Sequence, residues 1–153
     1  MSGAIPTTHE DGDTMFELID WSGTTDVSGW WYLLPGYLTL WSLTMGAWNF
    51  VDGEGMFARF GIDLSIEHDA DRFGLKSSAA RYLGIAAALV VGVFLVDAVA
   101  AAATALIARL TMDVLDLVGG LQTRQFDNVP VGIAQSVTMF IAPGVISLVW
   151  LLA

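Results

Sequence analysis

Asp97 is the residue whose type and position most directly suggest chemistry, because it is the one charged side chain in the run Tyr82–Ala108. A carboxylate at the centre of a membrane helix costs about 2.5–3.5 kcal/mol and by default marks a functional site. Thr104 shares its helix face, and Thr39 and Thr138 are expected at similar depth in the other apolar runs. These four residues form a predicted polar site within the membrane, suited to protons, cations or a ligand. Two structural alternatives stay open: a neutral Asp97 satisfied by packing, or a shifted helix that places it nearer the surface.

The same run carries a stripe of small residues, Gly84, Ala88 and Gly92, at positions i, i+4 and i+8. Such stripes let another helix approach closely in a membrane. At about 100° per residue, Asp97 falls about 180° from the centre of the stripe. This helix is therefore predicted to meet protein on two faces.

Two Pro-Gly pairs, Pro35-Gly36 and Pro143-Gly144, lie inside apolar runs. Proline removes a backbone hydrogen bond and frees the carbonyl four residues earlier, so we predict helix kinks at both pairs. Interrupted helices at matching positions of two repeats can mark a transport site. The match is short, however, and shared kink chemistry or chance is the favoured explanation.

Other motifs that carry chemistry are absent or weak. The acidic segment with Asp63, Glu67, His68, Asp69 and Asp71 does not have calcium-loop spacing, so a solvated loop and no metal site are expected. The chain has no cysteine, and its two histidines lie outside the apolar runs, which excludes thiolate metal sites and a bis-histidine haem within the membrane. No nucleotide-binding or hydrolase motif is present. We therefore predict no cofactor, and the sequence argues against an enzyme.

The elements that must position these residues are long uncharged runs. The chain has 153 residues, of which 55% are hydrophobic and only 14% charged, against about 25% charged in soluble domains. About 20 apolar residues span a bilayer core. The sequence therefore predicts an all-α, polytopic membrane protein with about three transmembrane helices, at Ser28–Phe50, Tyr82–Ala108 and Val131–Leu152. Residues 28–153 would form one membrane domain behind an acidic tail, residues 1–27.

A shorter amphipathic segment follows the second run. Its apolar residues repeat at helical spacing between Leu110 and Leu121, with Asp113 and Asp116 away from that stripe. Arg109 and Asp113 are spaced i,i+4, which predicts an ion pair. The segment either extends the second helix or lies flat in the membrane interface.

Charge predicts orientation and excludes one class of partner. Four lysines and arginines lie between the first and second runs, two between the second and third, and none in the tail. Cytoplasmic loops of membrane proteins are enriched in these residues. We therefore predict a cell-membrane protein whose first connection and C-terminus lie in the cytoplasm and whose N-terminus lies outside. The net charge of −10 is typical of proteins from salt-loving archaea, and no basic stripe for nucleic acid is present.

These observations favour a small multi-pass membrane protein that acts by contact, as a non-catalytic accessory or structural subunit of a membrane complex. Its expected partners are the lipid bilayer and other membrane subunits or further copies of itself. The alternative is a homo-oligomeric channel or transporter that uses Asp97 and the broken helices. An enzyme ranks third, because the polar side chains near the membrane are few.

Overall fold

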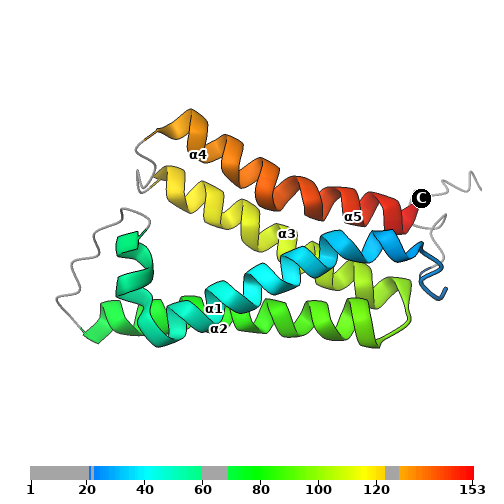
Figure 1. Ribbon diagram of the computed structural model, residues 1–153, viewed down its shortest axis with the longest axis horizontal. Helices are drawn as coiled ribbons and strands as arrows, with labels where there is room; N and C mark the ends of the chain where they lie inside the picture. The colour runs from blue at the N-terminus through cyan, green and yellow to red at the C-terminus, as the bar shows by residue number, and fades with distance from the viewer. Residues whose placement is uncertain (1–20, 22, 60–68, 123–127) are drawn as a thin grey trace, which may run out of the picture.

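The computed structural model describes residues 21, 23–59, 69–122 and 128–153, and these form helices joined by turns (Figure 1). The predicted all-α fold is confirmed for this part of the chain. The elements are the 3₁₀ turn η1 (Gly29–Tyr32), α1 (Leu33–Arg59), α2 (Asp69–Leu89), the π-helical η2 (Val90–Leu95), α3 (Val99–Gln122), α4 (Val129–Ser136), the π-helical η3 (Val137–Ile141) and α5 (Ala142–Leu152).

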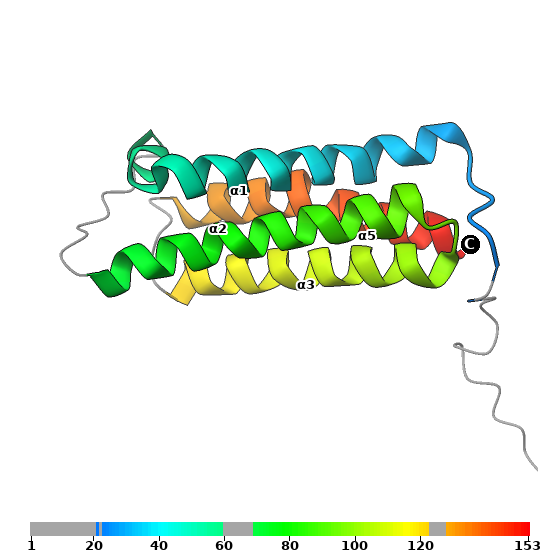
Figure 2. The same cartoon turned by 90° about the horizontal axis from the view of Figure 1, so that it is seen from below.

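These elements combine into four long helices, η1–α1, α2–η2, α3 and α4–η3–α5, which run alternately in opposite directions (Figures 1 and 2). α1 packs against α2 and α5, and α3 packs against the same two neighbours. One end of the bundle, which we call the turn end, holds the turn Val96–Ala98, the start of α1 and Leu152. The opposite end, the connection end, holds Arg59 and the start of α4.

The predicted single helix Tyr82–Ala108 is wrong. η2 ends at Leu95, Val96 is extended with φ −105° and ψ 110°, and a new helix begins at Val99. An unbroken helix from Asp69 to Gln122 would be about 80 Å long, far longer than a bilayer core of about 30 Å. The three predicted helices are therefore four. Both described ends of the chain lie at the turn end, whereas three passes would separate them.

Gly92 lets the two arms of this hairpin approach closely. A Cβ built on Gly92 would lie 2.6 Å from the carbonyl oxygen of Ala101 and 3.0 Å from the Cβ of Ala105. Only glycine avoids this clash with the backbone of α3. The small-residue position predicted to touch another helix does so within the chain.

The first predicted helix ends close to a charged residue, as its uncharged run indicated. α1 is interrupted at Asp52, with φ −143° and ψ 69°, and the Asp52 carboxylate accepts a hydrogen bond from the Gly55 amide at 3.0 Å. The uncharged run predicted as Ser28–Phe50 is helical up to this break. The amphipathic segment 110–121 is continuous with the rest of α3, so it extends a helix.

A cluster of buried hydrophobic residues reaches the turn end. Trp31 is fully buried there and packs with Leu38, Leu89 and Leu106. The indole Nε1 of Trp31 donates a hydrogen bond to the Ser147 carbonyl at 2.8 Å, which joins the start of α1 to α5.

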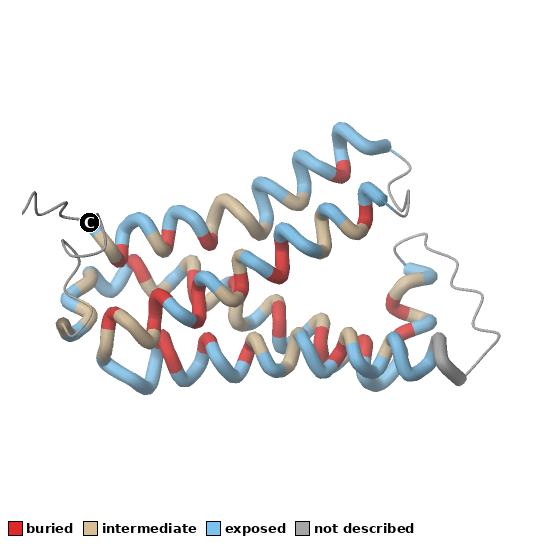
Figure 3. The backbone as a smooth tube through the Cα atoms, turned by 180° about the vertical axis from the view of Figure 1, so that it is seen from behind, coloured by how far each residue is buried: buried red, intermediate tan, exposed pale blue. Residues whose placement is uncertain are grey.

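Large hydrophobic side chains are exposed on every long helix, and the buried positions, red in Figure 3, are mostly apolar. Among the described residues, five polar or charged side chains are also buried: Ser42, Asn49, Arg109, Asp113 and Ser147. On α3, Val114, Leu115 and Val118 are exposed, whereas Arg109 and Asp113 are buried. Most buried residues of α3 are apolar, but in this part of the helix a charged pair faces the interior while the apolar side chains beside it face outward, unlike in a helix that packs in water.

Candidate functional site

Asp97 lies in the exposed turn between η2 and α3, so its predicted place at the centre of a membrane helix is wrong. Its Oδ1 accepts hydrogen bonds from the Thr25 hydroxyl at 2.6 Å and from the Thr25 amide at 2.9 Å. These bonds favour the carboxylate and lower the pKa of Asp97 below its usual range. The Val99 amide also donates to the Gly23 carbonyl at 3.1 Å. Asp97 therefore holds the segment before α1 against the hairpin turn.

The threonines of the predicted site do not meet Asp97. Each donates a hydrogen bond to a carbonyl four residues earlier in its own helix, at 2.8 Å for Thr39, 2.7 Å for Thr104 and 2.7 Å for Thr138. Such bonds satisfy a hydroxyl within an apolar helix without any partner helix. The structure therefore does not bring the four predicted residues together.

The stripe of small residues divides between two environments. Gly92 is buried against α3, whereas Gly84 has open space around it and Ala88 is exposed. Gly84 and Ala88 lie in two neighbouring shallow grooves on the outer face of the α2–α3 hairpin. The residues that line the groove containing Ala88 are mostly small: Ala88, Val91, Gly92, Ala100, Ala101, Thr104, Ala105 and Ala108.

The two Pro-Gly pairs also differ. Pro35 and Gly36 lie in the first turn of α1, directly after the 3₁₀ turn, where the missing N–H of proline is not needed, so no long helix is broken there. Pro143 follows the π-helical turn η3 at the start of α5, where the long helix α4–η3–α5 changes its hydrogen-bonding period. A Cβ on Gly144 would lie 2.6 Å from the Leu110 side chain, so this pair sits against α3.

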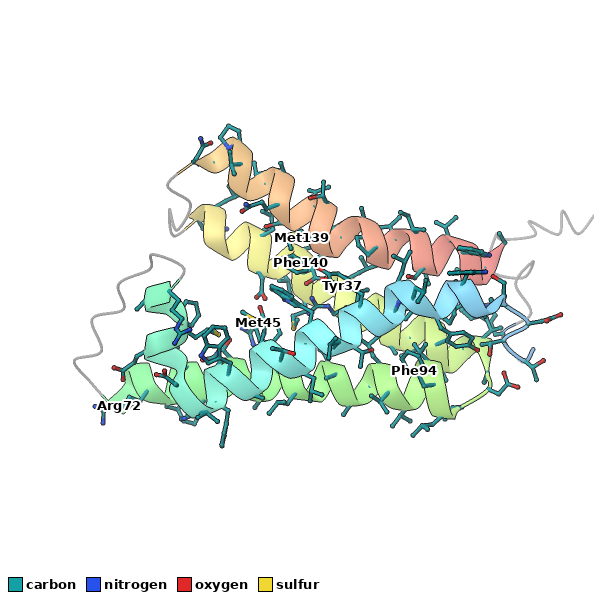
Figure 4. The ribbon with its side chains drawn as sticks, viewed as in Figure 1. Tyr37, Met45, Arg72, Phe94, Met139 and Phe140 are labelled. Carbon is teal, nitrogen blue, oxygen red and sulfur yellow. The ribbon has the colours of Figure 1, made fainter. Side chains whose placement is uncertain are left out.

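A cavity of about 460 Å³ lies between the α1–α2 pair and the α3–α4 pair, and sequence reasoning missed it. Figure 4 shows Met45 of α1 and Phe140 of η3 between the two pairs. Residues from all four long helices line the cavity: Trp41, Met45, Tyr82, Arg109, Asp113, Asp116, Leu117, Gly120, Gly132, Gln135, Ser136, Met139 and Phe140.

An ion pair forms the polar part of this cavity. Arg109 Nη2 lies 2.9 Å from Asp113 Oδ1, and the two side chains are only 1% and 7% exposed. The predicted i,i+4 pair is confirmed, but it faces the interior of the bundle. Arg109 Nε and Nη1 and Asp113 Oδ2 are buried without a hydrogen-bond partner. The guanidinium also lies 5.9 Å from the centre of the Phe140 ring.

A second polar group lies beside this pair. The Tyr82 hydroxyl donates to Asp116 Oδ2 at 2.9 Å, and Arg81 Nη2 lies 3.8 Å from Asp116 Oδ1. Arg81 is 57% exposed. α2 thus supplies Tyr82 and Arg81 and α3 supplies Asp116, and the hairpin turn at Val96–Ala98 places the two helices side by side.

The arrangement is suited to hydrogen-bonded recognition. Among the described residues, no three histidine or acidic side chains converge on a common point as metal ligands would. The acidic segment 63–71 was predicted to be a solvated loop, and this is wrong for residues 69–71, which belong to the first turn of α2. Residues 63–68 and the side chains of the whole segment lie outside the described part of the chain. The signal that could have revealed the cavity was the presence of Arg109, Asp113 and Asp116 next to an apolar run, because ionisable residues in such segments usually face protein.

Comparison with known protein families, curated proteins and solved structures found no match.

Proposed function

We propose that the chain is an integral membrane protein whose four long helices cross the bilayer, and that it acts by contact as a non-catalytic subunit of a membrane complex. Two helices, Arg72–Leu95 and Val129–Leu152, are long and apolar enough to cross a membrane. Each has 24 residues, or about 36 Å of α-helix, against a hydrocarbon core of about 30 Å.

The observation that carries this proposal is the inverted distribution of polar residues on α3. Its ionisable side chains Arg109 and Asp113 are buried and paired, while Val114 and Leu115 beside them are exposed. In water, this outer face would be a costly apolar patch. In a bilayer it is the expected arrangement, because intramembrane charges face the interior and pair with one another.

The positions of the charges also favour α1 and α3 as helices that cross the bilayer. α1 carries no charge from Leu33 to Val51, and it exposes Leu40, Leu43 and Phe50. The charges of α3 within the bundle are directed toward the cavity. Four crossings would put both termini on one side of the membrane.

Charge then favours an orientation. Arg59 ends α1 at the connection end, Arg72 and Lys76 lie in the first turns of α2 at the same end, and Arg81 lies near the middle of α2–η2, whereas the described residues at the turn end include no lysine or arginine. In the sequence, Arg124 lies between α3 and α4. The connection end is therefore expected in the cytoplasm and both termini outside. This keeps the predicted side for the N-terminus and reverses it for the C-terminus.

The grooves on the outer face of the α2–α3 hairpin support a contact role. Small side chains let a second backbone approach closely, and in lipid this packing is a main source of helix association. The partner would be another membrane subunit or a second copy of the chain. Gly84 has open space around it, so a larger residue there would fill a groove without disturbing the fold.

The test is purification from the native host in mild detergent and high salt, which suits the net charge of −10, followed by identification of co-purifying proteins. The variant Gly84→Leu should lose the partner. Gly74→Leu is the matched control, because Gly74 also has open space but lies outside both grooves. Equal capture by both variants, or a lone monomer from the parent chain, would contradict the contact role.

A channel or transporter is the second candidate. Asp97 no longer supports it, but the buried Arg109–Asp113 pair beside a cavity does. Ion flux through liposomes that contain only this purified chain would favour transport, and we expect none.

A further inference from the structure

We propose that the cavity between the two helix pairs binds a small zwitterion, a molecule that carries a carboxylate or phosphate and an ammonium group a few bonds apart. This goes beyond the contact role and does not depend on any partner subunit.

The charges around the cavity are already balanced. Arg109 pairs with Asp113 at 2.9 Å, and Arg81 lies 3.8 Å from Asp116. A ligand with a net charge would bring an uncompensated charge into a site of low dielectric constant, which is costly. The ligand should therefore be neutral overall.

Hydrogen bonding is not balanced. Two donor atoms of Arg109, Nε and Nη1, and one acceptor atom of Asp113, Oδ2, are buried without partners. Leaving buried polar atoms unpaired is costly, so the site favours a ligand with both an acceptor and a donor. Because both sets belong to one ion pair, the two ligand groups must lie close together. Charge-assisted bonds are about twice as strong as neutral ones, which favours an oxyanion and an ammonium over an amide.

The size and walls of the cavity fit this ligand class. A volume of about 460 Å³ lies within the range of about 300–1,000 Å³ for small-molecule sites. Trp41 and Phe140 supply aromatic faces, which attract ammonium groups, and Met45 and Met139 supply flexible apolar surface. A free amino acid and the headgroup of an ethanolamine phospholipid share this chemistry.

The experiment measures thermal unfolding of the full chain in nanodiscs. Free L-alanine should raise the unfolding midpoint if the ligand is soluble, whereas acetate and methylammonium, each with half of the chemistry, should not. If the ligand is a headgroup, nanodiscs with phosphatidylethanolamine should raise the midpoint relative to phosphatidylglycerol alone. If neither alanine nor phosphatidylethanolamine raises the midpoint, the proposal is wrong and the cavity holds only water.

Variants test whether the ion pair is the binding group. Arg109→Met combined with Asp113→Leu fills the space with apolar atoms, so it should fold and lose the midpoint shift entirely. Arg109→Lys keeps the charge but not the planar set of donors, and should bind at least about tenfold more weakly. Asp97→Asn, outside the cavity, should bind as the parent does. An unchanged shift in the double variant would overturn the proposal, even if partner capture is intact.

Discussion

Removing one member of the Arg109–Asp113 pair should destabilise the protein far more than removing both. The two side chains are 1% and 7% exposed and their charged atoms lie 2.9 Å apart. Breaking a buried pair leaves an uncompensated charge and costs about 3–5 kcal/mol, whereas replacing both partners by apolar residues is often neutral or stabilising. The variants are Arg109→Met, Asp113→Leu and the two combined.

The two single variants should also differ from each other. After Arg109→Met, Asp113 can lose its charge by taking up a proton. After Asp113→Leu, Arg109 cannot lose its charge, because guanidinium does not deprotonate in proteins. We therefore expect Asp113→Leu to lie at the upper end of the range, about 5 kcal/mol, and Arg109→Met near its lower end, about 3 kcal/mol.

The assay is reversible unfolding of all four proteins in mixed micelles, with the free energies combined in a double-mutant cycle. The double variant should lie within about 1 kcal/mol of the parent or above it, which gives a coupling energy of several kcal/mol. A double variant as unstable as the sum of the singles would refute the reasoning. It would mean that the two side chains act independently and that the pair is solvated.

The remaining predictions concern the hairpin and the turn end. Gly92→Ala should lower stability by about 1–3 kcal/mol, because its Cβ would lie 2.6 Å from a backbone oxygen of α3; an unchanged unfolding free energy would count against this close approach. Trp31→Phe should cost about 0.5–1.5 kcal/mol, because the Ser147 carbonyl loses the 2.8 Å hydrogen bond from the indole; a neutral effect in the same assay would mean that water replaces the indole. The hydrogen bonds from Thr25 lower the pKa of Asp97 below its ordinary value of 3.8. Their stabilising effect should therefore be complete above pH 3.8 and fade as the pH falls through the lowered pKa. Hydrogen exchange of the Thr25 amide measures this effect, and protection that does not change with pH across that range would exclude the role of the carboxylate.

Much of the fold is encoded in run lengths and charges. Asp52 ends the first uncharged run, and the backbone of α1 breaks at that residue. The apolar run near the C-terminus corresponds to α4–η3–α5. The hairpin turn was missed because Val96, Asp97 and Ala98 include no glycine or proline to signal a chain reversal. Asp97 was itself the signal: in a turn, a carboxylate avoids the cost of burial at the membrane centre.

The cavity could be predicted only in part. The spacing of Arg109 and Asp113 gave the ion pair correctly. Their direction could not be read from the sequence, because an amphipathic helix with acids off its apolar stripe usually faces those acids to water. The partners Tyr82 and Phe140 come from helices distant in sequence, and their approach depends on the hairpin.

The most direct test of the account is the sidedness of three positions, which is simple to measure because the chain has no native cysteine. Val96→Cys, Ala153→Cys and Ala58→Cys would each be exposed on intact cells to a thiol reagent that does not cross membranes. Ala58 is exposed near the end of α1, beyond the break at Asp52, so it reports on the connection end. Four crossings predict that Val96→Cys and Ala153→Cys react while Ala58→Cys reacts only after the cells are opened. If Val96→Cys and Ala153→Cys label from opposite sides, or all three label on intact cells, the four-helix membrane bundle is contradicted.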